Sequence, residues 1–405
     1  MKLSREQDKA LDLIQQWLRQ RDVQSFSLGG YAGTGKTTLM QHFINGLDNP
    51  PLCLAPTGKA ASVLQSKLAN AKVSTVHSAL YKPVPPSMND LDVLQAELLK
   101  HPDSKELQEA VEAEKRRLAN KDIGFALNKD QCKIMPGQLV IIDEASMVTR
   151  RMLNDLIDTG AMLLFVGDPG QLPPVSDDGF FCKNEPDVML TEVHRQALDS
   201  PIVRLSMDIR EGSVTSNSFD DGCQRMNKKQ LAGEEWLKFD QVLTGRNETR
   251  RRVNRYFRKQ LGHEGIWPQD QERLICLKND TKGANCYING IQATAVAASD
   301  HNEDFQDLTC DLLYDNRIIR TVPLYMYPFE VHYNDAAIDE PWQMRQGLQE
   351  FDYAYAITVH KSQGSEWDSV LLADDGMMAG QKDFRKRWLY TAVTRAKKEL
   401  VWVTD

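Results

Sequence analysis

The first half of the chain alternates short apolar runs with segments whose apolar residues recur at helical spacing. Leu11, Ile14, Trp17 and Leu18 predict a helix within residues 4–20. The apolar runs that follow are residues 25–28, 52–54, 139–142 and 163–166. Short apolar runs separated by helical segments are typical of a parallel sheet in an α/β fold.

Residues 88–120 interrupt this alternation. Apolar residues recur at helical spacing on both sides of a break at residues 101–103; they are Leu91, Leu94, Leu98, Leu107, Val111 and Leu118. We therefore predict two amphipathic helices, with Asp103 and Glu106 as the capping box of the second. A short strand pair is expected at residues 124–127 and 132–135.

A second α/β pattern starts near Val188. Its predicted elements are residues 241–243, 248–261 and 400–403. Residues 272–332 are rich in predicted strands and contain the turn signal Asn289-Gly290, so they are expected to form a small β-module. The α/β pattern resumes at Tyr353. The chain is therefore expected to contain two α/β lobes, each with an insertion.

Composition excludes several classes of protein. The 405 residues include 49 Lys+Arg and 57 Asp+Glu, a net charge of −8, which argues against indiscriminate coating of nucleic acid. No apolar run approaches the roughly 18 residues of a membrane helix, and the start lacks a secretory signal, so we expect a cytoplasmic protein. The 7 cysteines form no CxxC pair, which favours reduced thiols over disulfides or a zinc ribbon.

Residues 30–37 read GYAGTGKT and lie between a predicted strand and a predicted helix. In such a GxxxxGK[ST] loop, the glycines let backbone N–H groups turn towards phosphate, and the helix N-terminus adds its positive end. Lys36 is expected to reach the β- and γ-phosphates, and the Thr37 hydroxyl to bind Mg²⁺. The pattern predicts a nucleoside triphosphate site.

Two further strand ends carry polar groups. The run at 139–142 ends in Asp143 and Glu144, which suit a Mg²⁺ ligand and a base that activates water. The run at 163–166 leads into GDPGQLPPV, where Gln171 could orient water or sense the γ-phosphate. The residues alone fit a structural turn equally well.

These motifs and five others stand in an order that resembles superfamily 1B DNA helicases of the RecD-like and Dda-like subgroup. The blocks are GYAGTGKT (30–37), LAPTGKAA (54–61), TVHS (75–78), DEAS (143–146), GDPGQLPPV (167–175), TEVHRQ (191–196), ITVHKSQGSEWD (357–368) and YTAVTRAKK (390–398). The resemblance spans nearly the whole chain. It implies an α/β fold of two RecA-like P-loop NTPase lobes, parallel sheets flanked by helices, that clamp ATP between them.

The resemblance also assigns residues to ATP. It gives Lys36, Thr37, Asp143, Glu144 and Gln171 the phosphate, Mg²⁺, base and sensor roles described above. The residues expected around the rest of the nucleotide are Gln7 at the adenine, Gly33, Thr34, Gly35 and Thr38 at the phosphates, and Glu366 at the ribose. Arg195 and Arg395 match two arginines that the second lobe presents to the γ-phosphate.

A nucleic-acid track across both lobes is a further implication. The matching positions are Pro56, Thr57, Lys59, Thr75 and His77 in the first lobe, and Thr358, His360, Lys361 and Ser362 in the second. Hydroxyls, amides and a few cations are suitable ligands for DNA phosphates and read no sequence.

A basic stretch begins at Arg246 and Asn247 within an otherwise acidic chain. Its cations are Arg246, Arg250, Arg251, Arg252, Arg255, Arg258 and Lys259. The stretch fits a DNA contact and a solvated helix face equally well. The related family segment lies near nucleic acid, so Arg246 and Asn247 join the predicted DNA-binding set.

By the same resemblance the chain divides into four parts. They are a RecA-like domain 1A (1–80 and 136–182), an inserted pin region 1B (81–135), a RecA-like domain 2A (183–265 and 346–405) and an inserted SH3-like β-rich domain 2B (266–345).

We therefore expect an ATP- and Mg²⁺-dependent DNA helicase that moves 5′ to 3′ on single-stranded DNA and acts as a monomer. Its expected partners are single-stranded DNA, junctions with duplex, and replication or recombination proteins, in a bacterial or phage-infected cell. Three alternatives stay open: an RNA helicase of the same superfamily, a nucleotide-switched clamp, and a motor subunit that lacks unwinding of its own.

Overall fold

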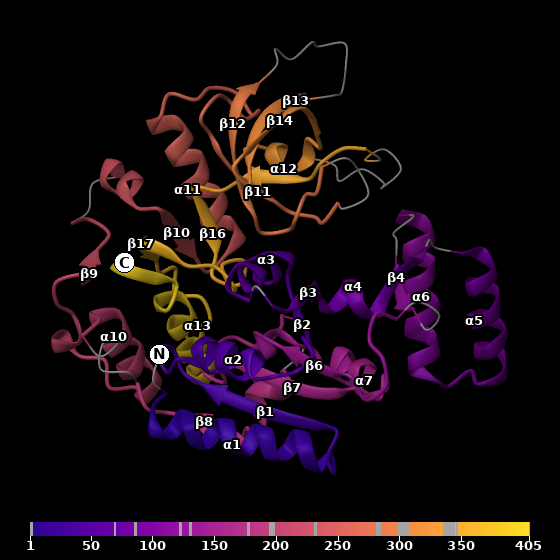
Figure 1. The fold of residues 1–405 in the computed structure, drawn as a ribbon. Helices are drawn as coiled ribbons and strands as arrows, with labels where there is room; N and C mark the ends of the chain where they lie inside the picture. The colour runs from indigo at the N-terminus through magenta and orange to yellow at the C-terminus, as the bar shows by residue number, and fades with distance from the viewer. Residues whose placement is uncertain are drawn as a thin grey trace.

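Two parallel β-sheets, each covered by helices, form the centre of the computed structural model (Figure 1). The structure describes residues 3–68, 70–84, 87–120, 124–128, 132–175, 179–193, 199–230, 233–280, 285–298, 308–334, 345 and 347–404. Within these ranges, every helix is too short or too polar to cross a membrane.

The first sheet has six parallel strands in the order β3-β2-β6-β7-β1-β8. Their bounds are β1 Ser25–Gly30, β2 Leu52–Ala55, β3 Lys72–Thr75, β6 Leu139–Ile142, β7 Met162–Gly167 and β8 Val188–Leu190. Side chains alternate across each strand, so Leu54 and Ile142 pack into one core and Cys53 and Ile141 into another. This confirms the predicted parallel α/β fold.

Helices cover both faces of this sheet. Their bounds are α1 Arg5–Gln20, α2 Lys36–Asn45, α3 Gly58–Lys67, α4 Val76–Leu80, α7 Arg150–Ile157 and α8 Phe180–Lys183, with the 3-10 turn η1 Ala145–Met147. α1 begins at a capping box in which Ser4 and Gln7 exchange hydrogen bonds, and it buries Ala10, Ile14 and Trp17. The predicted N-terminal helix is confirmed.

Two antiparallel helices, α5 Met88–Lys100 and α6 Lys105–Asn120, project from the first lobe beside each other (Figure 1). They confirm the predicted helical insertion. The expected capping box is wrong, because the Ser104 hydroxyl accepts the N–H of Leu107. Of the expected strand pair, the strand at 124–127 is confirmed as β5 Gly124–Leu127. Its expected partner at 132–135 is wrong, because β5 pairs with β4 Tyr81–Val84, where the chain entering the insertion offers an antiparallel partner.

The second sheet has five parallel strands in the order β16-β10-β17-β18-β9. Its strands are β9 Cys223–Asn227, β10 Gln241–Thr244, β16 Ala356–Thr358, β17 Trp367–Ala373 and β18 Ala396–Thr404. Its helices are α10 Pro201–Glu211, α11 Asn247–Gln260 and α13 Lys382–Val393, with the 3-10 turns η2 Ser216–Ser218 and η3 Gly233–Lys238.

The expected start of the second lobe near Val188 is wrong. Val188–Leu190 is β8, which pairs in parallel with β1 and forms the edge of the first sheet. The physical reason is that β1 would otherwise leave a row of unpaired backbone groups at that edge. A boundary between residues 182 and 183 therefore cuts the first sheet.

The β-module is a five-stranded antiparallel sheet in the order β14-β13-β12-β11-β15. Its elements are β11 Arg273–Cys276, β12 Gln292–Ala298, β13 Leu308–Tyr314, β14 Arg317–Leu324, α12 Tyr327–Glu330 and β15 Phe351–Tyr353. The strand-rich insertion is confirmed. The second lobe does not resume at Tyr353, because β15 pairs with β11, so the expected boundary at 345/346 is too early.

Three arginines of the basic helix α11 fasten the β-module to the second lobe. Arg258, fully buried, forms an ion pair with Glu272 at 2.8 Å. Arg255 donates to the carbonyl of His332 at 2.5 Å, and Arg250 pairs with the buried Asp352. The part of the basic stretch that contains these arginines therefore has a structural function.

We predict that Asp352→Asn weakens the joint between helix and module. Burial alone would raise the pKa of Asp352, but Arg250 and His332 outweigh it and lower that pKa from 3.8 to about 2. A depressed carboxyl pKa stabilises the fold above the unfolded value, and this contribution is lost as the pH falls through the folded value. The variant should therefore lose roughly 2 kcal/mol of unfolding free energy at neutral pH, measured by urea denaturation.

The deficit should shrink as the pH falls from about 4 towards 2. Asp368→Asn is the matched control, because Asp368 pairs with Lys398 on the exposed surface and its loss should leave the unfolding midpoint unchanged. A deficit that stays constant with pH would contradict the assigned pKa.

Candidate nucleotide and nucleic-acid sites

The Gly-rich loop joins the end of β1 to the start of α2. Gly33 and Gly35 have φ angles of 79° and 76°, a left-handed conformation that glycine adopts without strain. Lys36 is the first residue of α2, and its ammonium donates to the carbonyls of Gly30 at 2.5 Å and Tyr31 at 3.0 Å. The loop therefore has the strand–loop–helix geometry of a phosphate site.

The acidic pair follows β6 next to this loop. The backbone N–H of Asp143 donates to the carbonyl of Leu54 at 2.9 Å. Glu144 has a left-handed backbone with a φ of 51°, so the chain turns between the two carboxylates. Burial raises the pKa of Asp143, against the lowering effect of Lys36 and Lys67. Burial and the neighbouring Asp143 raise the pKa of Glu144 to about 7. A carboxylate with this pKa suits a general base.

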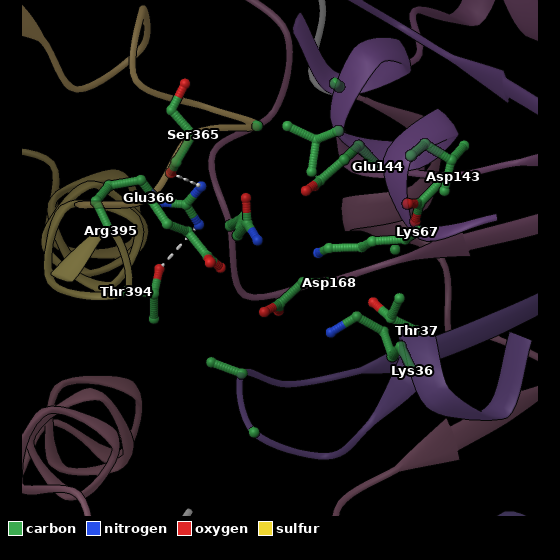
Figure 2. A pocket seen from close by; sticks show the side chains of 18 of the residues that line it. Lys36, Thr37, Lys67, Asp143, Glu144, Asp168, Ser365, Glu366, Thr394 and Arg395 are labelled. Carbon is green, nitrogen blue, oxygen red and sulfur yellow. Dashed lines mark hydrogen bonds between the residues drawn. The ribbon is translucent and has the colours of Figure 1, made fainter. Parts of the chain in front are cut away.

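A cavity of about 460 Å³ lies between the two lobes and collects these groups. From the first lobe it is lined by Lys36, Thr37, Asp143, Glu144 and Gln171, and Figure 2 shows Lys36, Thr37, Asp143 and Glu144 facing inwards. The structure therefore brings these five residues together at one cavity, and their contacts with phosphate stay a prediction.

Arg395 faces them from the second lobe (Figure 2). It is buried, and it donates to the carbonyls of Thr391 at 3.0 Å and Ser365 at 3.1 Å and to the Thr394 hydroxyl at 3.1 Å. The positive charge of Arg395 lowers the pKa of Glu144 across the cavity. Its guanidinium is thus held rigidly at the opposite wall.

Gln171 is buried, and its side-chain Oε1 has no hydrogen-bond partner among the residues that the structure describes. A buried polar atom without a partner is costly, so its position in the cavity wall favours a bound partner over a purely structural turn. Thr37 and Asp143 supply a hydroxyl and a carboxylate to the same cavity, and these are the oxygen ligands that Mg²⁺ prefers. The residues present therefore fit a nucleotide with Mg²⁺.

The predictions for residues around the rest of the nucleotide have mixed outcomes. Gly33 and Glu366 line the cavity, and Glu366 lies 3.8 Å from Lys397. Gln7 lies behind the loop instead, where its amide donates to the carbonyls of Thr34 and Gly35 at 3.2 and 3.3 Å. Its adenine contact stays a prediction.

Three other predicted nucleotide residues have different outcomes. Gly35 lines the cavity, whereas Thr34 and Thr38 lie outside its described lining. The Thr34 hydroxyl donates to Tyr31 at 2.8 Å, so it shapes the loop. Arg195 lies outside the described residues.

Sequence reasoning missed Lys67, and the structure places Lys59 in the wall of the same cavity. Lys59, Val63 and Lys67 lie at i, i+4 and i+8 on α3, so one helix face points all three into the nucleotide cavity. Lys59 also stands over the Trp367 ring at 5.4 Å. The helical spacing of the two lysines was the available signal for Lys67, and the contact of Lys59 with DNA stays a prediction.

The remaining predicted DNA residues gather at strand ends. Ala55 at the end of β2 pairs with Thr75 at the end of β3, so Pro56 and Thr57 lie beside Thr75. In the second lobe, Thr244 at the end of β10 pairs with Thr358. Arg246 and Asn247 follow β10 and are exposed.

The first and second lobes contact each other where Gly364 lies close to Thr57. A methyl group at Gly364 would lie 3.7 Å from the Thr57 hydroxyl and 3.1 Å from Ala60. His360 is half-buried against Phe384, while His77 is exposed and packs against Tyr81 and Phe125.

The β-module also contacts both lobes near this point. Lys361 donates to Asn289 of its turn at 2.5 Å, and a methyl group at Gly58 would lie 2.3 Å from Ile288. Ser362 differs from its prediction: it is fully buried, and its hydroxyl donates to Val359 at 2.7 Å. That hydroxyl shapes the turn after β16.

The family models agree with this geometry. A model described as an AAA domain matches residues 2–228, and a model described as a UvrD-like helicase C-terminal domain matches residues 353–403. The first match covers more than half of the chain and contains the Gly-rich loop and the acidic pair. The second contains Arg395.

Curated relatives and solved structures point the same way. The chain is 26% identical over 295 residues to the ATP-dependent RecD2 DNA helicase of Deinococcus radiodurans, covering 65% of this chain and 36% of the relative. It thus spans about a third of that relative's length. It is 24% identical over 412 residues to the ATP-dependent DNA helicase Pif1 of Bdellovibrio bacteriovorus, covering 91% of this chain and 81% of the relative.

A structure of Pif1 helicases unwinding forked double-stranded DNA superposes with a TM-score of 0.55 at 19% identity, covering 99% of this chain and 92% of the other. At this identity the likeness confirms the two-lobe α/β fold.

The burial of Ser362 leads to a prediction. Ser362→Ala should change the affinity for single-stranded DNA by less than about twofold, because the hydroxyl bonds within its own turn. Lys361→Ala should weaken affinity by roughly tenfold, since a charged donor contributes more to a phosphate contact. Fluorescence anisotropy with a labelled oligothymidylate measures both. Equal losses in the two variants would contradict the assignment.

Proposed function

Because this chain belongs to the AAA-domain family and its homologues are superfamily 1B DNA helicases such as RecD2 and Pif1, we propose that it is an ATP-dependent DNA helicase. We propose further that it moves 5′ to 3′ on single-stranded DNA and unwinds duplex at a junction. Its place of action would be the cytoplasm of a bacterial or phage-infected cell.

One observation carries the proposal: groups from both lobes converge on a single cavity with the chemistry of triphosphate hydrolysis. Lys36 would neutralise the β- and γ-phosphates, and Thr37 with Asp143 would hold Mg²⁺, which offsets developing charge on the phosphate oxygens. Glu144 would accept a proton from the attacking water, with Gln171 orienting it.

Arg395 would complete the site from the second lobe. A guanidinium supplied across the cleft stabilises the charge of the transition state, so hydrolysis depends on closure of the lobes. A clamp that only switches between nucleotide states has little use for this full set. The arrangement therefore favours a turnover enzyme over the clamp.

The arrangement of the predicted DNA-binding residues supports the second part of the proposal. Thr57 and Thr75 lie at the ends of β2 and β3 in one lobe, Thr358 lies at the end of β16 in the other, and Thr57 lies near Gly364 of the second lobe. Hydroxyls and amides there would bind a DNA backbone without reading sequence. Alternating grip of the two lobes, driven by ATP, would move the strand.

We predict that Lys36→Ala abolishes ATP hydrolysis, because the ammonium that neutralises the phosphates is removed. The loss should be at least about a hundredfold in the rate of phosphate release. Lys72→Ala is the matched control: Lys72 is exposed at the start of β3 and away from the cavity, so its rate should equal that of the parent. Parent-level hydrolysis by Lys36→Ala would refute the site.

Strand displacement tests the helicase itself. Two identical DNA duplexes, one with a 5′ and one with a 3′ single-stranded tail, are incubated with ATP. We expect displacement only from the 5′ tail. Displacement only from the 3′ tail would overturn the polarity, and DNA-stimulated hydrolysis without displacement would indicate a translocase. Stronger stimulation by RNA would favour the RNA helicase.

A further inference from the structure

Helix α13 of the second lobe forms hydrogen bonds with the loop that follows β7 in the first lobe. This loop consists of residues 168–172 and contains Gln171. Arg387 donates to the carbonyls of Pro169 and Gln171, and the Thr391 hydroxyl accepts the N–H of Leu172 at 2.9 Å. Residues 387, 390 and 391 lie at i, i+3 and i+4, so one face of α13 makes these contacts.

Tyr390 lies at the centre of this face and is almost fully buried. Its hydroxyl donates to a carboxylate oxygen of Asp168 at 2.6 Å and accepts the N–H of Ala32 at 2.8 Å. Ala32 is in the Gly-rich loop, while Asp168 begins the loop that contains Gln171. A single phenol of the second lobe therefore joins the two phosphate-facing loops of the first.

The space around the phenol is restricted. A methyl group at Gly170 would lie 3.2 Å from the Tyr390 ring. The other oxygen of the Asp168 carboxylate accepts the N–H of Gly170 at 2.9 Å, so both of its oxygens are occupied.

The second lobe also touches the neighbouring residue of the Gly-rich loop. The guanidinium of Arg210, on α10, lies 3.8 Å from the centroid of the Tyr31 ring. Tyr31 and Ala32 both pack against the core of the second lobe. The tip of the Gly-rich loop is thus held between two helices of the opposite lobe.

We propose that Tyr390 is a positioning residue: its hydroxyl fixes the Gly-rich loop and the 168–172 loop relative to each other and ties both to the second lobe. The effect on hydrolysis rests on the proposed function, whereas the mechanical link does not. A movement of α13 would shift both loops together with Arg395, which lies two residues beyond the end of that helix.

Tyr390→Phe is the decisive variant, because it keeps the ring and removes only the hydroxyl. The N–H of Ala32 and one oxygen of Asp168 then lose their shared partner. We expect kcat for ATP to fall by roughly tenfold, the effect of losing a hydrogen bond to a charged group, with KM changed by less than about threefold. Lys382→Ala, at the exposed start of the same helix, is the matched control and should keep the parent's kcat.

Hydrogen–deuterium exchange provides a readout that does not depend on activity. Peptides covering residues 30–36 and 168–172 should both exchange faster in Tyr390→Phe than in the parent or in Lys382→Ala. Faster exchange in only one segment, or in neither, would overturn the proposal. A general loss of stability would instead raise exchange across all strands, and that outcome would also overturn it.

The two tests separate the inference from the proposed function. If the parent hydrolyses ATP and Tyr390→Phe has the same kcat, the positioning role is wrong while the ATPase stands. If the parent does not hydrolyse ATP, the proposed function fails, and the exchange of the two segments still decides whether Tyr390 joins them.

Discussion

Parallel strands end at the same edge of a sheet, and this constraint determines where the chemistry of the protein lies. β1, β6 and β7 are neighbours in the first sheet, with Gly29 beside Gly167 and Ile142 beside Phe165. The Gly-rich loop, the acidic pair and the 168–172 loop therefore emerge side by side. The second sheet meets the same cavity with the starts of its strands: Arg395 immediately precedes β18, and Glu366 immediately precedes β17.

The sequence predicted the features whose signal is local. The Gly-rich loop, Asp143 with Glu144, and the strands around them depend on neighbouring residues and their spacing, so pattern alone located them. Features that depend on tertiary burial could not be located in this way. The hydroxyl of Ser362 is directed inwards by its turn, and Lys67 is directed to the cavity by the rotation of α3.

The boundaries between parts were the least predictable. Val188–Leu190 and Phe351–Tyr353 are strands of three residues, and each is added to a sheet because an edge strand there accepts a partner. Three residues carry too little periodicity to show which sheet they join. The structural role of the α11 arginines was equally hard to predict, because Arg250 and Arg258 form ion pairs with carboxylates in distant segments.

The ammonium of Lys36 donates to two carbonyls of its own loop. Under the proposed function, entry of a triphosphate would be an exchange of partners, in which these internal hydrogen bonds are replaced by contacts to phosphate oxygens. The affinity for nucleotide would then be the difference in free energy between two states in which the Lys36 ammonium has hydrogen-bond partners.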